Sequence, residues 1–181
     1  MASQSLRSAT CLNATCTPEE FSGVKITISQ VEYSNAPDGP VIHIFGRDVR
    51  GKAVRLDITG FRPYFYIPAD QAESIAQSSQ IMVEPGTIYR SIRGEPLRRL
   101  YTQRPTDVRD VRERYRHFEA DIPFATRYMI DSGLTGGASA PATLSDYHEV
   151  TPADVDAPAR VCILDIECRM NAVFLIPSGM Q

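Results

Sequence analysis

Alternation of apolar and polar residues with a period of two is the feature that most limits how this chain can fold. It begins with Val24, Ile26 and Ile28, continues toward Tyr33, and returns at 41–45 and 54–58. A period of two places every second side chain on the same face of a β-strand. Turn residues separate the three segments. The sequence therefore predicts an antiparallel β-meander.

A second pattern, in which strands and helices alternate, follows the meander. It predicts strands at 63–68, 81–83, 97–103 and 117–120, and helices at 70–77 and 106–115. The order β-α-β-β-α-β is that of a ferredoxin-like, two-layer arrangement with helices on one face of a sheet. The predicted fold class is α+β, an antiparallel meander joined to this βαββαβ unit.

Composition predicts the domain boundaries. Residues 1–22 are rich in Ser, Thr and Ala without apolar periodicity, which predicts a disordered extension. A helix at 123–132 ends the first domain, 23–132, and the turn residues of 133–159 predict a linker. An apolar run at 160–167 predicts a buried strand, and 160–181 is interpreted as the first hairpin of a truncated domain.

Charge excludes a generally basic nucleic-acid binder, because the net charge is -3 and the pI about 5.6. Within this acidic chain, residues 86–118 hold nine arginines against four carboxylates. This arginine-rich segment is a candidate phosphate-binding surface. A solvated helix face whose charges pair with one another explains the same composition, and both interpretations stay open.

The four cysteines form neither a CxxC motif nor a Cys/His cluster, so no zinc site is predicted. Cys162 lies in the apolar run and is predicted to be a core residue. Thiols without an N-terminal signal pattern predict a cytoplasmic protein. The absence of an apolar run of about 18 residues argues against a membrane as a partner.

Asp165 and Glu167 stand two residues apart at the end of the apolar run. Side chains two apart in a strand point to the same face, so both carboxylates converge on one spot. Such a pair suits a hard divalent cation, and paired metals drive phosphodiester hydrolysis. A solvated strand end is the alternative, and the chain supplies no further carboxylates after Glu167 to complete a site.

Aromatic residues and prolines form a further candidate group, made of Tyr33, Pro63, Tyr64, Tyr66, Pro105 and Phe124. Aromatic rings near arginines are typical of sites that stack single-stranded bases. The alternative is that these side chains fill the interface between sheet and helices. The residue patterns alone support a phosphate- or nucleic-acid-binding α+β domain.

Several motifs, in one order along the chain, resemble the N-terminal domain of family B DNA polymerases. They are PVIHIFGRD at 40–48, GFRPYFY at 60–66, RPTDVR at 104–109 and YRHFEA at 115–120. DIPFATRYMID at 121–131 is similar to the archaeal branch, and LDIE at 164–167 resembles the first exonuclease motif. The resemblance runs from about residue 24 to residue 167.

The resemblance implies an N-terminal fragment of a DNA polymerase, with 160–181 as the start of an RNase H-like 3'-5' exonuclease domain. Asp165 and Glu167 are then part of the ligand set for Mg2+ or Mn2+ in the full-length parent, and the fragment needs no cofactor. No polymerase or nuclease turnover is expected of it. The implied partners are single-stranded template DNA, the rest of the polymerase chain and, through the parent, a sliding clamp.

Archaeal members of this family carry a pocket that captures uracil in the template strand. Seven residues of this chain fall in the corresponding motifs: Tyr33, Pro63, Tyr64, Pro105, Val108, Phe124 and Arg127. The resemblance assigns Tyr33 and the prolines to the walls, Val108 to the floor, and Arg127 to a phosphate or to bracing a wall. The alternative hypotheses are a metal-dependent 3'-5' exonuclease fragment and a ferredoxin-like RNA-binding module.

Overall fold

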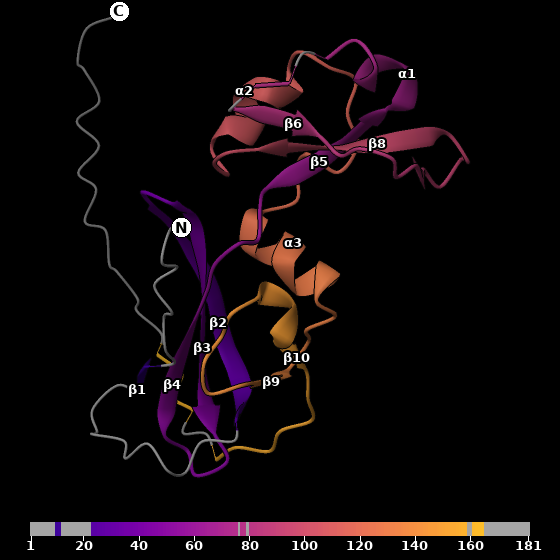
Figure 1. Ribbon diagram of the computed structural model, residues 1–181. Coiled ribbons are helices and arrows are strands. Elements are labelled where there is room, and N and C mark those ends of the chain that lie inside the picture. The colour runs from indigo at the N-terminus through magenta and orange to yellow at the C-terminus, as the bar shows by residue number, and fades with distance from the viewer. Residues whose placement is uncertain (1–9, 12–22, 76, 79, 159–160, 165–181) are drawn as a thin grey trace, which may run out of the picture.

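The computed structural model describes residues 10–11, 23–75, 77–78, 80–158 and 161–164. It is a mixed structure of two antiparallel sheets and short helices, as the sequence predicts. The two sheets lie at opposite ends of the view in Figure 1, and helix α3 lies between them.

The larger sheet contains the predicted meander. Its strands, in spatial order, are β1 (Thr10–Cys11), β4 (Ala53–Ile58), β3 (Gly39–Asp48), β2 (Val24–Ala36), β9 (Gly137–Ala140) and β10 (Thr151–Pro152). Ile26, Ile44 and Leu56 are fully buried, so the apolar positions of the alternating pattern form the core of this half. The meander of β2, β3 and β4 confirms the prediction from periodicity.

The smaller sheet is built by the second pattern. It contains β5 (Tyr64–Pro68), β8 (Pro96–Thr102) and β6 (Ile81–Val83) in that order, with β7 (Tyr89–Arg90) also paired to β8. Helices α1 (Ala69–Ala72) and α2 (Asp107–Arg112) cover one face. Phe65 and Leu100 pack there against Val111 of α2 in an apolar cluster. Both helices are shorter than predicted.

The strand predicted at 117–120 is reduced to a single bridge between Tyr66 and Phe118. The two residues exchange backbone hydrogen bonds of 3.1 and 2.8 Å. Glu119 then adopts φ 57, in the left-handed region, which breaks the extended conformation that a ladder needs. The prediction of a full fourth strand was therefore wrong.

Helix α3 (Phe124–Asp131) agrees with the predicted helix at 123–132. Pro123 precedes its first turn, and Gly133 follows it with φ 66, the conformation that commonly ends helices. Phe124 and Tyr128 pack against Phe61 with ring centroids 5.5 and 5.2 Å apart. These contacts attach the helix to the core of the larger sheet.

The segment predicted as a linker, 133–159, instead contributes to the larger sheet. Strand β9 pairs with β2, where Ala138 lies opposite Ile26, and a short 3-10 helix, η2 (Tyr147–Glu149), follows. Ala138 and Val150 are buried. The hydrophobic pattern did not predict this strand because its residues are small. The packing requires a small residue at Gly137, since a Cβ there would lie 2.4 Å from the Ala153 carbonyl oxygen.

The apolar run near the end does not form the predicted buried strand within its described residues, 161–164. Val161, Ile163 and Leu164 are 82–90% exposed, and Cys162 is exposed rather than in the core. A strand buried on both faces needs neighbours on both faces, and the described part of the chain offers none here. The rest of the predicted hairpin lies outside the described residues.

The predicted extension at 1–22 contributes one short described piece, β1, whose Thr10 pairs with Arg55. The other residues of this range lie outside the described part. Among the described helices, none combines the length and hydropathy that a membrane-spanning helix requires.

Candidate functional site

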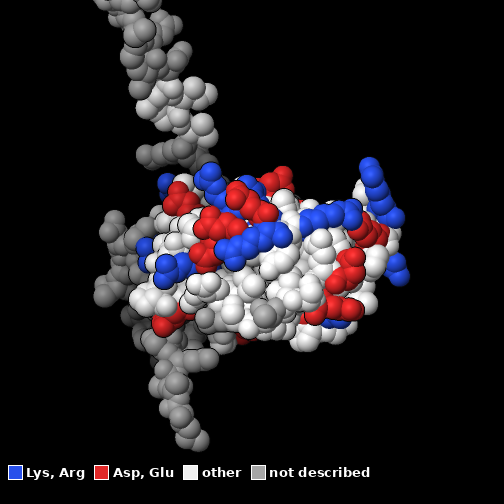
Figure 2. All heavy atoms as spheres, turned by 90° about the horizontal axis from the view of Figure 1, so that it is seen from above, with Lys and Arg blue, Asp and Glu red and all other residues white. Residues whose placement is uncertain are grey.

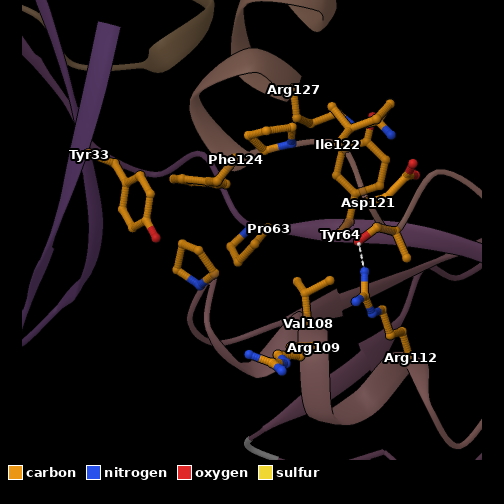
Figure 3. A pocket seen from close by; sticks show the side chains of 13 residues that line it. Tyr33, Pro63, Tyr64, Val108, Arg109, Arg112, Asp121, Ile122, Phe124 and Arg127 are labelled. Atoms are coloured by element: carbon orange, nitrogen blue, oxygen red, sulfur yellow. Dashed lines mark hydrogen bonds between the residues drawn. The ribbon is translucent and has the colours of Figure 1, made fainter. Parts of the chain in front are cut away.

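The structure brings the seven predicted site residues together around one pocket of about 250 Å3. They come from β2, the start of β5, the loop and helix after β8, and α3. The complete lining is Tyr33, Pro63, Tyr64, Pro105, Val108, Arg109, Arg112, Ala120, Asp121, Ile122, Pro123, Phe124 and Arg127. Figure 3 shows how these side chains surround the space.

The walls of the pocket are largely aromatic and apolar. Tyr33 meets Phe124 edge to face, with ring centroids 5.4 Å apart, although Tyr33 itself is 40% exposed. Pro63, just before β5, and Val108 of α2 face the same space (Figure 3). Rings held by edge-to-face contact and prolines with a fixed φ make walls that change shape little.

Arg127 is buried beneath this wall with 5% of its surface exposed. Its Nη1 lies 2.8 Å from a carboxylate oxygen of Glu119, and its Nη2 donates to the Glu119 carbonyl at 3.2 Å. Its guanidinium carbon lies 4.9 Å from the centre of the Tyr64 ring. Burial alone lowers the pKa of Arg127, but Glu119 and Tyr64 outweigh it and raise the pKa overall. The geometry therefore favours bracing over phosphate binding.

The Tyr64 side chain is held in place by its hydroxyl group as well as by the contact of its ring with Arg127. The hydroxyl donates to both carboxylate oxygens of Asp131, at 2.8 and 3.0 Å. Burial, followed by the hydrogen bond to Asp131, raises the pKa of Tyr64 well above its ordinary value. The phenol therefore stays neutral at physiological pH and holds β5 against α3.

The backbone of Tyr64 lies at an edge of the smaller sheet. Thr102 donates its N–H to the Pro63 carbonyl at 2.9 Å. In an antiparallel ladder, hydrogen-bonded pairs alternate with pairs whose backbone groups point away from each other. Tyr64 lies opposite Tyr101 and belongs to the next pair along. Its N–H and C=O therefore point away from β8.

On that outer side, β5 pairs among the described residues only through the isolated bridge between Tyr66 and Phe118. A longer ladder would place Ala120 opposite Tyr64. The left-handed backbone of Glu119 turns the chain away, and Ala120 lines the pocket instead. The Tyr64 N–H is consequently directed to the pocket side of β5.

Sequence reasoning missed four residues that shape this site: Glu119, Asp131, Arg109 and Arg112. Arg112 donates to the Ala120 carbonyl at 3.2 Å (dashed in Figure 3) and so holds the loop that lines the pocket. Asp131 stands four residues after Arg127 in a helix, a spacing that places both on one face and could have identified it. Nothing in the sequence marks Glu119 as left-handed.

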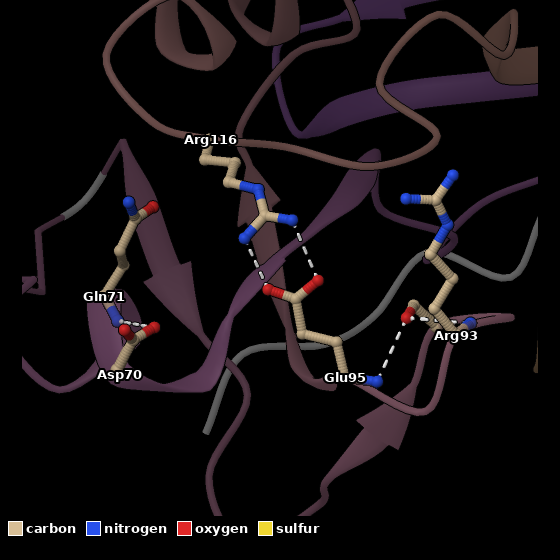
Figure 4. A network of polar contacts seen from close by, with 6 residues as sticks. Asp70, Gln71, Arg93, Glu95 and Arg116 are labelled. Atoms are coloured by element: carbon tan, nitrogen blue, oxygen red, sulfur yellow. Dashed lines mark hydrogen bonds and ion pairs between the residues drawn. The ribbon is translucent and has the colours of Figure 1, made fainter.

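The arginine-rich segment does not act as one surface. Figure 2 shows acidic and basic side chains intermixed on the face seen from above. Arg116 pairs with Glu95 through two contacts of 2.5 and 2.9 Å (Figure 4). Arg99 instead stacks on Tyr64 at 4.4 Å, beneath that surface. These contacts favour paired charges for part of the segment and leave Arg109 exposed at the pocket.

Asp165 and Glu167 lie outside the described residues, so their predicted metal site remains a prediction. Within the part that the structure describes, no three His, Cys, Asp or Glu side chains are grouped as metal ligands would be.

Comparisons with known proteins agree with the resemblance found in the motifs. No family model matches the chain. A DNA polymerase of Pyrococcus horikoshii is 33% identical over 127 residues, which cover 60% of this chain and 10% of that protein. A DNA polymerase of Thermococcus kodakarensis is 32% identical over 126 residues, 59% of this chain and 8% of that protein.

The relatives that match at 32–33% identity over about 60% of this chain are archaeal family B DNA polymerases. The homologous part corresponds to their N-terminal region, and the chain spans only a small share of their length. Among solved structures, the family B DNA polymerase of Pyrobaculum calidifontis is 31% identical. That match covers 60% of this chain and 16% of the other, with a TM-score of 0.49.

Proposed function

We propose that the pocket binds a uracil base of single-stranded template DNA, and that this region serves a DNA polymerase as its template sensor. The observation that carries the proposal is the convergence of seven residues, from four separate segments, on one cavity. Homology to archaeal DNA polymerases supplies the context. The mechanism uses shape, backbone polarity and charge.

Shape separates uracil from thymine, which carries one more methyl group. We propose that Val108 as floor and Pro63 and Phe124 as walls, all of which line the pocket, exclude that methyl by steric overlap. One methyl is worth about 1–3 kcal/mol, or roughly 10- to 200-fold in affinity. These walls yield little, because Phe124 and Pro63 are themselves buried.

Backbone polarity separates uracil from cytosine. The outward Tyr64 N–H can donate to a uracil carbonyl oxygen, whereas cytosine presents an amino group at the equivalent position. The Tyr64 N–H and the cytosine amino group are both donors, so they cannot form a hydrogen bond with each other. An unpaired buried donor costs about 1–3 kcal/mol, so cytosine is also disfavoured.

Charge holds the strand without reading its sequence. Arg109 lies exposed at the pocket, where it can meet a backbone phosphate. The target base comes from a single strand, so little stacking must be broken to insert it.

Fluorescence anisotropy tests the proposal with two single-stranded oligonucleotides that differ only in one uracil or thymine, at low and moderate salt. We expect uracil to be preferred at least tenfold, and Val108→Gln to remove the preference by filling the floor. Val49→Gln, the same change at a side chain 59% exposed and outside the pocket lining, is the matched control. Equal, salt-sensitive binding of both strands would contradict the proposal and indicate a generic phosphate contact.

A further inference from the structure

A second, larger cavity of about 510 Å3 lies beside the first pocket, with Tyr64 as their shared wall. It is formed where the end of α3 and η2 face β8 and β6. Its lining is Gly60, Phe61, Arg62, Tyr64, Met82, Glu84, Arg99, Tyr101, Asp131, Ser132, Tyr147 and His148. Its volume falls in the range of pockets that hold small organic ligands.

One face of α3 runs from the first pocket to the second. Phe124 and Arg127 line the first, Asp131 lines the second, and their spacing of three and four residues places them in one stripe. At 1.5 Å per residue the stripe covers about 10 Å. A stacked single strand advances about 3.4 Å per nucleotide, so a strand of a few nucleotides spans both pockets.

The second pocket presents aromatic rings that are not sealed in the core. Tyr101 and Tyr147 are both partly exposed at its lining. Phe61 holds Tyr147 edge to face at 5.4 Å, which fixes the orientation of that ring. Partly exposed, oriented rings are the platforms on which single-stranded bases stack.

Cationic charge is available beside these rings. The Arg62 guanidinium lies 5.7 Å from the Tyr101 ring centre and makes a weak 3.9 Å contact to the Met82 sulfur. No carboxylate among the described residues pairs with it. Of the two carboxylates that line this pocket, Asp131 already accepts the Tyr64 hydroxyl hydrogen, and Glu84 forms no ion pair with Arg62. Arg62 is therefore placed to meet a phosphate.

From this arrangement we infer that the second pocket binds a nucleotide of the same strand, a few positions from the uracil. Its base stacks on Tyr101 and Tyr147 while Arg62 contacts its phosphate. The inference rests on the proposed function, because uracil in the first pocket brings that nucleotide to the second. Every nucleobase has an aromatic face, so the second pocket adds affinity with little sequence preference.

The test compares binding of dUMP with that of a six-nucleotide strand containing one uracil, using the full chain. We expect Arg62→Gln to reduce the affinity gained between dUMP and the strand by about tenfold, the low end of one stacked and anchored nucleotide. Arg93→Gln, an exposed arginine outside both pockets, keeps that gain. A retained gain in Arg62→Gln would overturn the inference.

A second measurement places 2-aminopurine about three nucleotides from the uracil, the number that spans about 10 Å at about 3.4 Å each, and follows its fluorescence, which stacking quenches. Quenching in the wild type that is lost in Tyr147→Leu supports the inference, provided that the variant melts as a folded protein. Quenching that free dAMP competes away would instead mark a site for free nucleotides and overturn it. A wild type without uracil preference contradicts the proposed function, whereas intact preference with no effect of Arg62 or Tyr147 contradicts only the second pocket.

Discussion

The two faces of the smaller sheet differ in chemistry although the same strands make both. Toward α1 and α2, alternate residues of β5 and β8 are Phe65, Ile67 and Leu100, all fully buried. Toward α3, the residues between them include Tyr64 and Arg99. The first face stabilises the sheet by excluding water, and the second contributes Tyr64 to the lining of both pockets. Period-two alternation thus places packing residues and pocket-lining residues on opposite faces of one strand.

Arg99 shows how the second face is held without a hydrocarbon core. Its guanidinium lies 4.4 Å from the Tyr64 ring centre and 4.5 Å from that of Tyr89. Burial alone lowers its pKa, but the hydrogen bonds that it donates to neighbouring tyrosines, Tyr66 first, outweigh burial and raise the pKa overall. The residue stays charged and stacks as a flat plate.

The largest expected effect comes from breaking the apolar face. Leu100→Ala removes a fully buried side chain and leaves a cavity, so the free energy of unfolding falls by about 2–5 kcal/mol. Ile92→Ala, at a side chain fully exposed on the hairpin, changes it little. Urea denaturation measures both. Equal losses of unfolding free energy in the two variants would mean that burial on the apolar face does not stabilise the sheet.

High pH tests the tyrosine face. Because the folded pKa of Tyr64 lies above the unfolded value of about 10, its contribution is complete below pH 10 and is lost as pH rises toward the folded pKa. We expect stability to fall above pH 10 by about 1.4 kcal/mol per pH unit for each tyrosine that stays protonated. Tyr64→Phe removes one such increment from the slope, and Leu100→Ala leaves the slope unchanged. Chemical denaturation between pH 8 and 11 measures both slopes.

The meander was predictable, because alternation of apolar and polar residues indicates which side chains are buried. The two faces of β8 were not, because its arginines are consecutive and Arg98, two residues before Leu100, lies on the same face as Leu100. Strand β9 was not predictable, since its Gly-Ala-Ser-Ala residues carry almost no hydrophobic signal and take their place only through pairing with β2. The apolar run at 161–164 was the opposite case: its hydrophobic residues predicted a buried strand, but they are exposed because no described segment packs against them.

The seven site residues were predicted from resemblance, since no local pattern joins Tyr33 to Phe124 across the chain. The residues that hold these side chains in place were harder to predict, because their contacts depend on the tertiary structure. Glu119 is the clearest case: its left-handed backbone ends the bridge after Phe118 and turns both its carboxylate and its carbonyl to Arg127.

Substitution of Glu119 separates its two roles. Glu119→Ala loses the ion pair to buried Arg127, which is half screened by solvent, and keeps the strained backbone, so stability falls by about 1–2 kcal/mol. Glu119→Gly loses the same pair but adopts the left-handed conformation freely and recovers about 1 kcal/mol. Thermal and urea unfolding compare the two variants. A glycine variant less stable than the alanine variant would show that backbone strain is absent.

The smallest expected effect concerns Arg109, exposed at the mouth of the first pocket. A phosphate contact adds affinity to every strand equally, so Arg109→Gln weakens uracil and thymine oligonucleotides alike, by a few-fold at low salt. The dependence of log affinity on log salt becomes shallower by about one unit, because one fewer counterion is released. Anisotropy titrations across a salt series measure both quantities. A change in the uracil-to-thymine ratio would instead place Arg109, beside Val108 on helix α2, among the residues proposed to read the base.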